Sequence, residues 1–300
     1  LFIKRAAFMS DTFYFLISCE VNWVGFIILF NYFINFFSNN FVIKLFNSTL
    51  TFNLFGHFVS SYRINGQNYQ EISLNNGKGE FVSADDGAEI LKIAEDEAFV
   101  YAQVDDLGSV EKKDYLQMHI DAVLALSTVD VELVKSAKFK VVVDAVNSTG
   151  GIYLPALLHK MGVDVVELYC EPNGHFPHNP EPLKENLGDI MKTVVAQSCD
   201  VGLVVDPDVD RLALISEDGS MFGEEYTLVA IADYLLALKP GHTVSNLSSS
   251  RALRDVAARH NSTYSASAVG EVNVVTEMKA KNAIVGGEGN GGIILPELHY

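Results

Sequence analysis

The chain has 300 residues, 49% of them hydrophobic, which is enough for two or three domains with sizeable cores. Its 38 acidic and 21 basic residues give a formal net charge of −17, which argues against nucleic-acid binding and for a soluble, cytoplasmic protein. The three cysteines, Cys19, Cys170 and Cys199, form no Cys-x-x-Cys pair, so they fit a reducing compartment better than a disulfide framework or a zinc site.

Residues 1–65 differ in composition from the rest of the chain, because they are rich in Phe and Asn and hold only two acids. The apolar stretch Phe26–Phe37 is interrupted by asparagines and is shorter than the roughly 20 residues of a spanning helix, so a membrane span is the less favoured alternative. The sequence Leu16-Ile17-Ser18-Cys19 matches a lipoprotein cleavage box, a second alternative. We favour the interpretation that this segment is translated AT-rich sequence or a disrupted reading frame outside the folded protein.

The globular part begins in residues 66–138. Ser83, followed by two aspartates, predicts the start of a helix over Asp86–Phe99, since acids stabilise the positive end of a helix. A repeated apolar face predicts a second helix over Val110–Leu126.

Residues 139–222 alternate strand and helix patterns and begin with a right-handed βαβ unit. The predicted elements are strands over Phe139–Val143 and Val163–Leu168 with a helix over Ile152–Met161 between them, a helix over Leu183–Cys199, and strands over Val201–Val205 and Leu212–Ile215.

The loop 171–182 is rich in proline, which excludes the interiors of helices and strands. It carries His175 and His178. These histidines suggest a metal pair as one interpretation, but ordinary loop positions are favoured because no other ligand lies nearby in the sequence.

The turn Asp206-Pro207-Asp208-Val209-Asp210-Arg211 joins the last two strands. Its three carboxylates, at alternate positions, repel one another at close range and therefore call for a cation. Oxygen ligands alone favour a hard metal, Mg²⁺ before Ca²⁺ or Mn²⁺, and Arg211 suits a phosphate sharing the site. A calcium-binding EF-hand is disfavoured because Arg211 stands where that loop needs glycine. A purely structural acidic turn stays an alternative.

Residues 223–300 form a second α/β unit. The predicted elements are helices over Glu224–Leu238, Ser250–His260 and Val272–Lys281 and strands over His242–Leu247, Ser262–Ala266 and Ala283–Val285.

The glycine-rich loop 286–292 follows the last of these strands and lacks the Gly-Lys-Ser/Thr of a P-loop. Glu288 and Asn290 offer polar groups suited to sugar hydroxyls, and the turn at Gly270 is a further ligand-facing candidate, with a solvated turn as the alternative in each case. The unusual loops follow strand ends, where open α/β sheets bind ligands. The sequence therefore predicts consecutive α/β modules with mixed sheets that bind a divalent metal and a phosphorylated polyol.

Four motifs in this order resemble the α-D-phosphohexomutases, a family that includes phosphoglucomutase, phosphomannomutase and phosphoglucosamine mutase. Asp206–Arg211 resembles the metal loop Asp-Gly-Asp-x-Asp-Arg, and Gly286–Gly292 resembles the sugar-binding loop in a Gly-Glu-Gly-Asn-Gly variant. Phe176–Pro182 and Val143–Gly151 resemble loops of the second domain. The variant glycine loop is most similar to bacterial phosphoglucosamine mutase-like members.

The resemblance implies an enzyme of four domains around a cleft. In such enzymes a phosphoserine passes its phosphoryl group to a hexose phosphate, and the bisphosphate reorients and returns the other phosphate. Hexose 6- and 1-phosphates are thereby interconverted, and glucosamine phosphate is the favoured substrate here.

The resemblance also implies roles for individual residues. Asp206, Asp208 and Asp210 would hold Mg²⁺, with the seryl phosphate as a remaining ligand, and Arg211 would orient or neutralise that phosphate. The sugar would be gripped by further residues, namely Glu288, Asn290 and, as cleft lining, Gly270.

The chain also departs from the family pattern. The nucleophile loop Ala-Ser-His-Asn-Pro is expected just before Asn68, but Arg63 stands at the serine position and Ser61 would serve only in a shifted register. Pro207 and Asn290 replace the usual glycine and serine.

We therefore expect an incomplete family member with impaired activity. Its parts would be a non-family segment over 1–65, a remnant of domain 1 over 66–138, domain 2 over 139–222 and most of domain 3 over 223–300, with domain 4 absent. A non-catalytic remnant that binds metal and sugar phosphate is the alternative.

Overall fold

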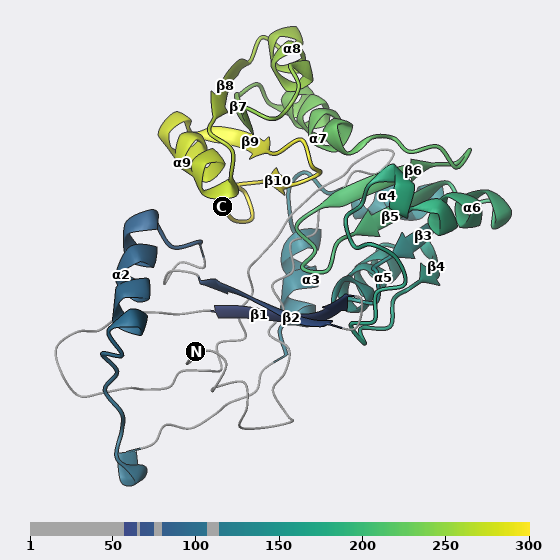
Figure 1. Cartoon of the computed structure of the whole chain (residues 1–300). Helices are drawn as coiled ribbons and strands as arrows, with labels where there is room; N and C mark the ends of the chain where they lie inside the picture. Colours follow the sequence, from purple (N-terminus) through teal and green to yellow (C-terminus); the bar gives the residue numbers. More distant parts are fainter. Residues whose placement is uncertain (1–56, 65–66, 75–79, 107–113) are drawn as a thin grey trace.

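The computed structural model describes residues 57–64, 67–74, 80–106 and 114–300, the first two ranges by their backbone alone (Figure 1). In chain order the elements are β1 (His57–Ile64), β2 (Gln67–Leu74), α2 (Ala84–Glu95), η1 (Val104–Asp106), α3 (Leu116–Leu124), α4 (Val131–Ala137), β3 (Lys140–Asp144), α5 (Gly150–Lys160), β4 (Asp164–Leu168), η2 (Lys184–Asn186), α6 (Gly188–Ala196), β5 (Val201–Val205), β6 (Leu212–Ser216), α7 (Glu224–Leu238), β7 (His242–Asn246), α8 (Ala252–Arg259), β8 (Thr263–Ser267), α9 (Glu271–Lys281), β9 (Ala283–Gly287) and β10 (Ile293–Ile294).

The first module is built on a four-stranded mixed sheet in the order β4-β3-β5-β6. Strand β3 pairs in parallel with β4 and β5, and β6 pairs with β5 antiparallel. Successive residues of β3 face opposite sides: Val141 and Val143 pack toward α5, whereas Val142 packs with residues of α6. Because both faces of the sheet are covered, the central strands β3 and β5 carry runs of buried valines, and each fully buried valine contributes roughly 1.5–3 kcal/mol of hydrophobic stabilisation.

The second module repeats this plan with a sheet in the order β10-β9-β7-β8. Strand β7 pairs in parallel with β8 and β9, and the short β10 runs antiparallel to β9. Met278 of α9 packs on one face beside Val244, and Leu253 of α8 joins Val285 on the other. Helix α9 and the pair α7 and α8 therefore lie on opposite sides of this sheet (Figure 1).

One hydrophobic cluster continues from the first module into the second. It includes Leu154 of α5 and Leu212 of β6 together with Leu228 of α7 and Ile293 of β10. Shared burial of this kind resists relative displacement of two units, because separating them would expose apolar surface to water. The modules are thus joined by packing as well as by the chain.

The predicted α/β class with mixed sheets is confirmed. Several boundaries differ. The helix predicted over Asp86–Phe99 is α2, which starts at Ala84 because the Ser83 side chain accepts a hydrogen bond from the backbone N–H of Asp86. The second predicted helix corresponds to α3, Leu116–Leu124, and the predicted residues 110–113 lie outside the described residues. The structure adds α4, whose capping aspartate, Asp130, the sequence analysis overlooked.

Two further predictions are wrong in extent. A single helix over Leu183–Cys199 is replaced by η2 and α6, because Leu187 takes non-helical angles that bury its side chain fully before α6 begins. The last strand runs on to Gly287, and β10 was missed. Glycine is required at position 286, where a Cβ would lie 2.4 Å from Met278 Sδ.

Helices α3 and α4 contribute Ile120, Val123 and Val134 to the core of the first module. The core thus extends upstream of residue 139, and the division of the chain at that position stays a prediction. The apolar stretch Phe26–Phe37 and the box Leu16–Cys19 lie outside the described residues. Among the residues that are described, no helix combines the length and the apolar character needed to cross a lipid bilayer.

One core residue makes stability depend on pH. His119 of α3 is 2% exposed, neither ring nitrogen has a hydrogen-bond partner, and its ring meets that of Tyr153 edge-on. Burial lowers the pKa of His119 from 6.5 to about 4. The unfolded chain therefore binds this proton more readily, and stability is lost as the pH falls from 6.5 toward 4.

We expect the free energy of unfolding to drop by about 1.4 kcal/mol between about pH 7.5 and 5.5 on account of His119 alone. His119→Leu should abolish that part of the pH dependence, measured by urea unfolding at both pH values. His159→Gln, at the exposed end of α5, is the control and should leave the dependence unchanged. Equal pH dependence in His119→Leu and the unmodified chain would contradict the assignment.

Candidate metal and sugar-phosphate site

The acidic turn 206–211 leaves the carboxyl end of β5, as the sequence predicts. Asp206, Asp208 and Asp210 each offer a carboxylate oxygen, and these oxygens all lie within 4.8 Å of one another. Val209 adopts φ 66°, a left-handed conformation that costs a β-branched residue about 1–3 kcal/mol, and its side chain is fully buried. The turn is thus held in a strained shape that brings the three carboxylates together.

The start of α5 packs directly against this turn. Thr149 Oγ1 donates a hydrogen bond to the carbonyl oxygen of Pro207 at 3.2 Å. A Cβ at Gly150 would lie 2.6 Å from a methyl carbon of Val205, so glycine allows the helix to approach the end of β5. The motif over 143–151 and the acidic turn, 58 residues apart, are therefore in direct contact.

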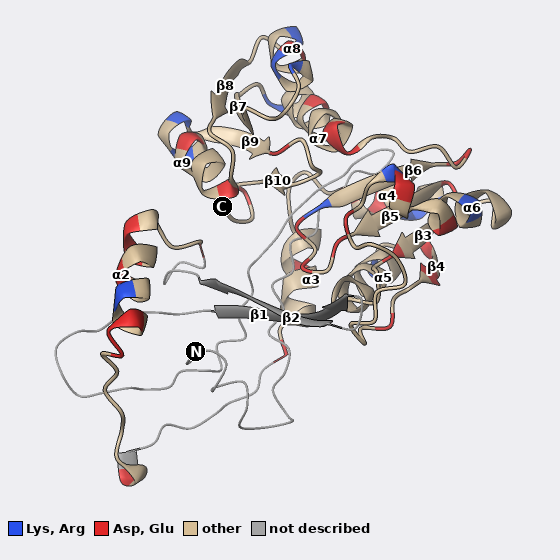
Figure 2. Ribbon diagram, viewed as in Figure 1, with Lys and Arg blue, Asp and Glu red and all other residues tan. Residues whose placement is uncertain are grey.

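Holding the ionised carboxylates of the turn close together and partly buried costs electrostatic free energy. Burial raises the pKa of Asp206 well above its usual range, and repulsion from Asp210 and Asp208 raises it further. Burial, followed by repulsion from Asp210, raises the pKa of Asp208 to about 6. Acidic positions occur throughout both modules (Figure 2), but few are buried as Asp206 is. An oxygen donor set with this excess negative charge fits a hard divalent cation.

Arg211 adjoins the trio and is shared among three carboxylates. Its backbone N–H donates to Asp206 Oδ1 at 3.0 Å, and its Nε lies 3.5 Å from Asp210 Oδ1. Its Nη1 pairs with Glu181 Oε1, from the proline-rich loop. Burial lowers the pKa of Arg211, but the three carboxylates outweigh it, so the pKa lies above its ordinary value. The sequence analysis missed Glu181, although it is part of the quoted motif over 176–182.

The residues predicted to grip a sugar are brought together in the second module. Glu288 Oε1 accepts hydrogen bonds from Gly270 N at 3.0 Å and from Asn246 Nδ2, and Asn290 Nδ2 donates to Glu288 Oε2 at 3.3 Å. Gly270 has φ 108°, a conformation that favours glycine. Asn246 was missed, although its place at the carboxyl end of the buried strand β7 is a usable signal.

The glycine loop lies directly against the acidic turn. Gly291 has φ 97°, and a Cβ there would lie 2.5 Å from the carbonyl oxygen of Leu212. A Cβ at Gly292 would lie 3.5 Å from the carbonyl oxygen of Asp210. The acidic turn and the glycine loop therefore form one site at the junction of the two modules.

Glu271 is a further acid at this junction, next to Gly270. Burial raises its pKa to about 8, and repulsion from Asp210, Glu288 and Asp208 contributes. The charges of both loops therefore act on this carboxyl group. The sequence analysis gave Glu271 no role of its own, because its charge environment depends partly on Asp208 and Asp210, about 60 residues away.

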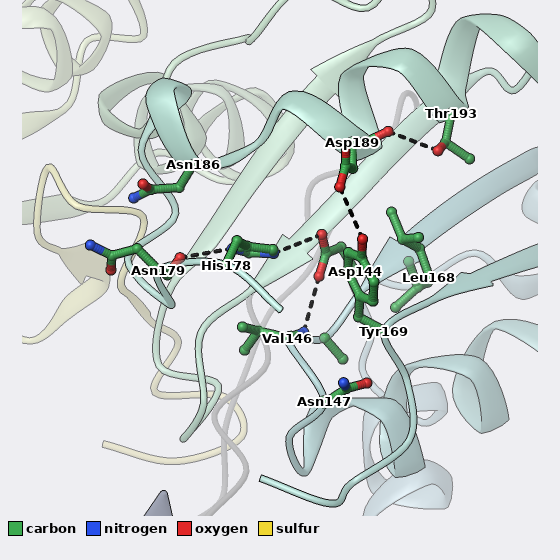
Figure 3. Close-up of polar contacts among 12 residues, drawn as sticks. Asp144, Val146, Asn147, Leu168, Tyr169, His178, Asn179, Asn186, Asp189 and Thr193 are labelled. Carbon is green, nitrogen blue, oxygen red and sulfur yellow. Dashed lines mark hydrogen bonds and ion pairs between the residues drawn. The ribbon is translucent and has the colours of Figure 1, made fainter. Parts of the chain in front are cut away.

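The two histidines of loop 171–182 do not join the acidic trio, so the alternative of a metal pair gains no support. Figure 3 shows His178 between Asp144 and Asn179, with Nε2 3.1 Å from Asp144 Oδ2 and Nδ1 2.8 Å from the carbonyl oxygen of Asn179. The backbone oxygen of His175 accepts from Asn147 Nδ2 at 3.0 Å. Both residues fasten the loop to the end of β3.

The segment where the family would carry its nucleophile forms strand β1. Arg63 pairs in register with Asn68 of β2, and Ser61 with Gln70. Only the backbone is described here, so the identity of a nucleophilic serine stays open to experiment.

Known families match most of the described chain. The profile described as phosphoglucomutase/phosphomannomutase, alpha/beta/alpha domain II, matches residues 117–219, and that for domain III matches 223–300. A phosphoglucomutase/phosphomannomutase of Thermococcus kodakarensis is 33% identical over 252 residues, which is 83% of this chain and 55% of that protein. A probable phosphoglucosamine mutase of Methanopyrus kandleri is 30% identical over 78% of this chain and 51% of its own length. The chain spans about half the length of the curated relatives it matches.

Solved structures share the fold. A putative phosphomannomutase from Thermus thermophilus superposes with a TM-score of 0.68 at 21% identity, over 81% of this chain and 55% of that one. A phosphoglucomutase/phosphomannomutase family protein from Burkholderia thailandensis gives 0.66 at 23% identity, over 81% and 51%. At this identity the likeness concerns the fold alone.

The raised pKa of Asp208 carries a stability consequence. When a carboxyl group has a higher pKa in the folded than in the unfolded chain, the folded protein becomes less stable as the pH rises from the unfolded pKa through the folded one. At neutral pH the metal-free protein is therefore destabilised by the ionised Asp208. Asp208→Asn is therefore expected to stabilise the metal-free chain by about 1–2 kcal/mol at about pH 7.5.

Thermal unfolding in EDTA measures this effect, and repeating it with Mg²⁺ shows whether the stabilisation by metal is lost in the same variant. Glu217→Gln, exposed in the hairpin after β6, removes the same charge and should change neither value. Destabilisation of the metal-free protein by Asp208→Asn would contradict the proposed repulsion.

Proposed function

Because the chain belongs to the α-D-phosphohexomutase family, we propose that the protein takes part in the interconversion of hexose 6- and hexose 1-phosphates. The observation that carries the proposal is the convergence of the acidic trio, Arg211 and the glycine loop at one junction. These groups come from two modules, and together they offer a cation site, a phosphate partner and sugar-binding groups.

Each group has a role that follows from its chemistry. Asp206, Asp208 and Asp210 would hold the cation, for which we propose Mg²⁺, and the Arg211 guanidinium would orient a phosphate beside it. Bound Mg²⁺ would supply positive charge where charge develops on a transferring phosphoryl group. Glu288 accepts hydrogen bonds from sugar hydroxyls, while Asn290 and the turn at Gly270 fix its orientation.

We further propose a phosphoserine donor, a hexose bisphosphate intermediate and a preference for glucosamine phosphate. The variant glycine loop supports this preference, as does the relative from Methanopyrus kandleri, which is described as a probable phosphoglucosamine mutase. Glu288 places a carboxylate among the proposed sugar-binding groups, which would favour an ammonium group on the substrate.

The second candidate function is binding of metal and sugar phosphate without turnover. It is favoured by the departure at the nucleophile loop, where Arg63 occupies the serine position. Without a nucleophile the phosphoryl group has no covalent carrier, so cycling stops even with an intact cation site.

Titration calorimetry with Mg²⁺ and with glucosamine 6-phosphate tests the common part of both candidates. We expect the chain to bind both ligands. Glu288→Gln should weaken hexose phosphate binding about tenfold while Mg²⁺ affinity stays the same, because a charged acceptor is lost at the sugar and none at the metal. Glu89→Gln, exposed on α2, is the matched control. Binding of neither ligand would overturn the proposed function.

A coupled mutase assay separates the two candidates. We expect the 300-residue chain to show little turnover, with or without glucose 1,6-bisphosphate. Sustained turnover stimulated by the bisphosphate would show that the nucleophile lies within this chain and would exclude the non-catalytic candidate.

A further inference from the structure

The loop 171–182 has a part in the site that its sequence does not reveal. It begins after β4 and is tied to the turn following β3, where Asn147 N donates to the carbonyl oxygen of Tyr169 at 2.6 Å and Gly174 N donates to that of Asn147 at 3.0 Å. Its far end reaches the acidic turn through the ion pair of Glu181 with Arg211. The loop is thus fastened at one end to the turn after β3 and at the other to Arg211.

His178 lies between these ends and is held as a cation by geometry. Asp144, 1% exposed, accepts at Oδ1 from Val146 N at 3.0 Å, which turns Oδ2 toward His178 Nε2. His178 Nδ1 faces the carbonyl oxygen of Asn179 (Figure 3). Both ring nitrogens therefore face oxygens that only accept hydrogen bonds, and only the imidazolium can donate to both.

The surroundings of His178 favour the same state. Asp144 of β3 and Asp189 of α6 are the charged groups near it, and the Tyr169 ring meets it edge-on while its hydroxyl donates to Asp189 (Figure 3). Burial lowers the pKa of His178, but the hydrogen bond and the charge of Asp144 outweigh burial and raise it above 6.5.

Glu181 is placed by the backbone of the same loop. Its N–H donates to Asn179 Oδ1 at 3.1 Å, and its carbonyl oxygen accepts from Leu183 N and Asn186 Nδ2, each at 2.8 Å. With its backbone fixed in this way, its carboxylate reaches Arg211 Nη1.

The pairing with Glu181 bears on the metal site because Arg211 has competing partners. Its Nε lies 3.5 Å from Asp210 Oδ1 and 4.0 Å from Asp206 Oδ2. Without its contact to Glu181, the guanidinium of Arg211 would donate hydrogen bonds from more of its N–H groups to these two carboxylates. It would then compete with a cation for their oxygens.

We propose that Glu181, carried on a loop held in place by the His178 imidazolium, is a positioning residue that keeps Arg211 from occupying the metal-binding carboxylates and keeps its guanidinium directed toward a phosphate. The proposal rests on the proposed function for the identity of the cation and the phosphate. The contact of Glu181 with Arg211 and the protonation of His178 can be tested without either.

Titration calorimetry of the full chain with Mg²⁺ tests the effect on the metal. Glu181→Gln should weaken Mg²⁺ binding about tenfold. The variant loses the charged partner of Arg211, and the guanidinium then pairs with the carboxylates that would bind the metal. Glu185→Gln, which removes an exposed carboxylate four residues along, should leave the affinity within about twofold, because an exposed charge in salt is screened. Equal affinities for Glu181→Gln and the unmodified chain overturn the proposal.

An NMR measurement without any ligand separates this inference from the proposed function. The Nε–H signal of Arg211, assigned from its loss in Arg211→Lys, should shift in Glu181→Gln and stay in place in Glu185→Gln. An unshifted signal in Glu181→Gln overturns the positioning role, whereas a failure of the unmodified chain to bind Mg²⁺ overturns the metal site instead.

The hydrogen bonds of the His178 imidazolium with Asp144 and Asn179, which we call the loop clamp, have their own test. Histidine ¹⁵N spectra near pH 7, with His178 assigned from its loss in His178→Gln, should show both ring nitrogens protonated. A neutral tautomer at that pH overturns the clamp. A shifted Arg211 Nε–H signal in His178→Gln supports transmission along the loop, and an unshifted one overturns it.

Discussion

Repulsion among the carboxylates of the acidic turn is the constraint on which the rest of the site depends. Three aspartates are held within 4.8 Å of one another at the end of a buried strand, by a turn whose Val209 is itself strained. This arrangement costs stability in the metal-free protein, because burial and mutual repulsion raise the pKa of Asp206 and Asp208. Arg211 offsets part of the charge, and the remainder is the basis for the cation binding that we propose for this turn.

The site also depends on close approach between two modules. The glycine at 291 allows the second module's loop to lie on the carbonyl oxygen of Leu212, and Gly292 lies beside the carbonyl oxygen of Asp210. The cluster that runs from α5 to α7 holds the modules together beneath this contact. The proposed sugar-binding groups are therefore fixed relative to the acidic turn by backbone packing.

Sequence reasoning succeeded where the signal is local. Apolar runs predicted the strands of the two four-stranded sheets except β10, and crowded carboxylates after a strand predicted a cation site that the geometry fits. It failed where an element's limits depend on tertiary contacts. Leu187 interrupts a predicted helix because the core accepts its side chain, and Gly286 continues a strand because it pairs with Val244 of β7 and Ile294 of β10. Glu181, Asn246 and Glu271 were missed for the same reason.

The sequence by itself determined the fold class, the family resemblance and the residues of the acidic turn and glycine loop, because each of these is encoded in residues close together along the chain. Tertiary structure alone decided that the turn and the loop form one site, since their contact joins backbone atoms about 80 residues apart. It also decided the partners of Arg211 and the state of His178. Both follow from which oxygens the folded chain brings within hydrogen-bonding distance, and spacing along the sequence does not specify that.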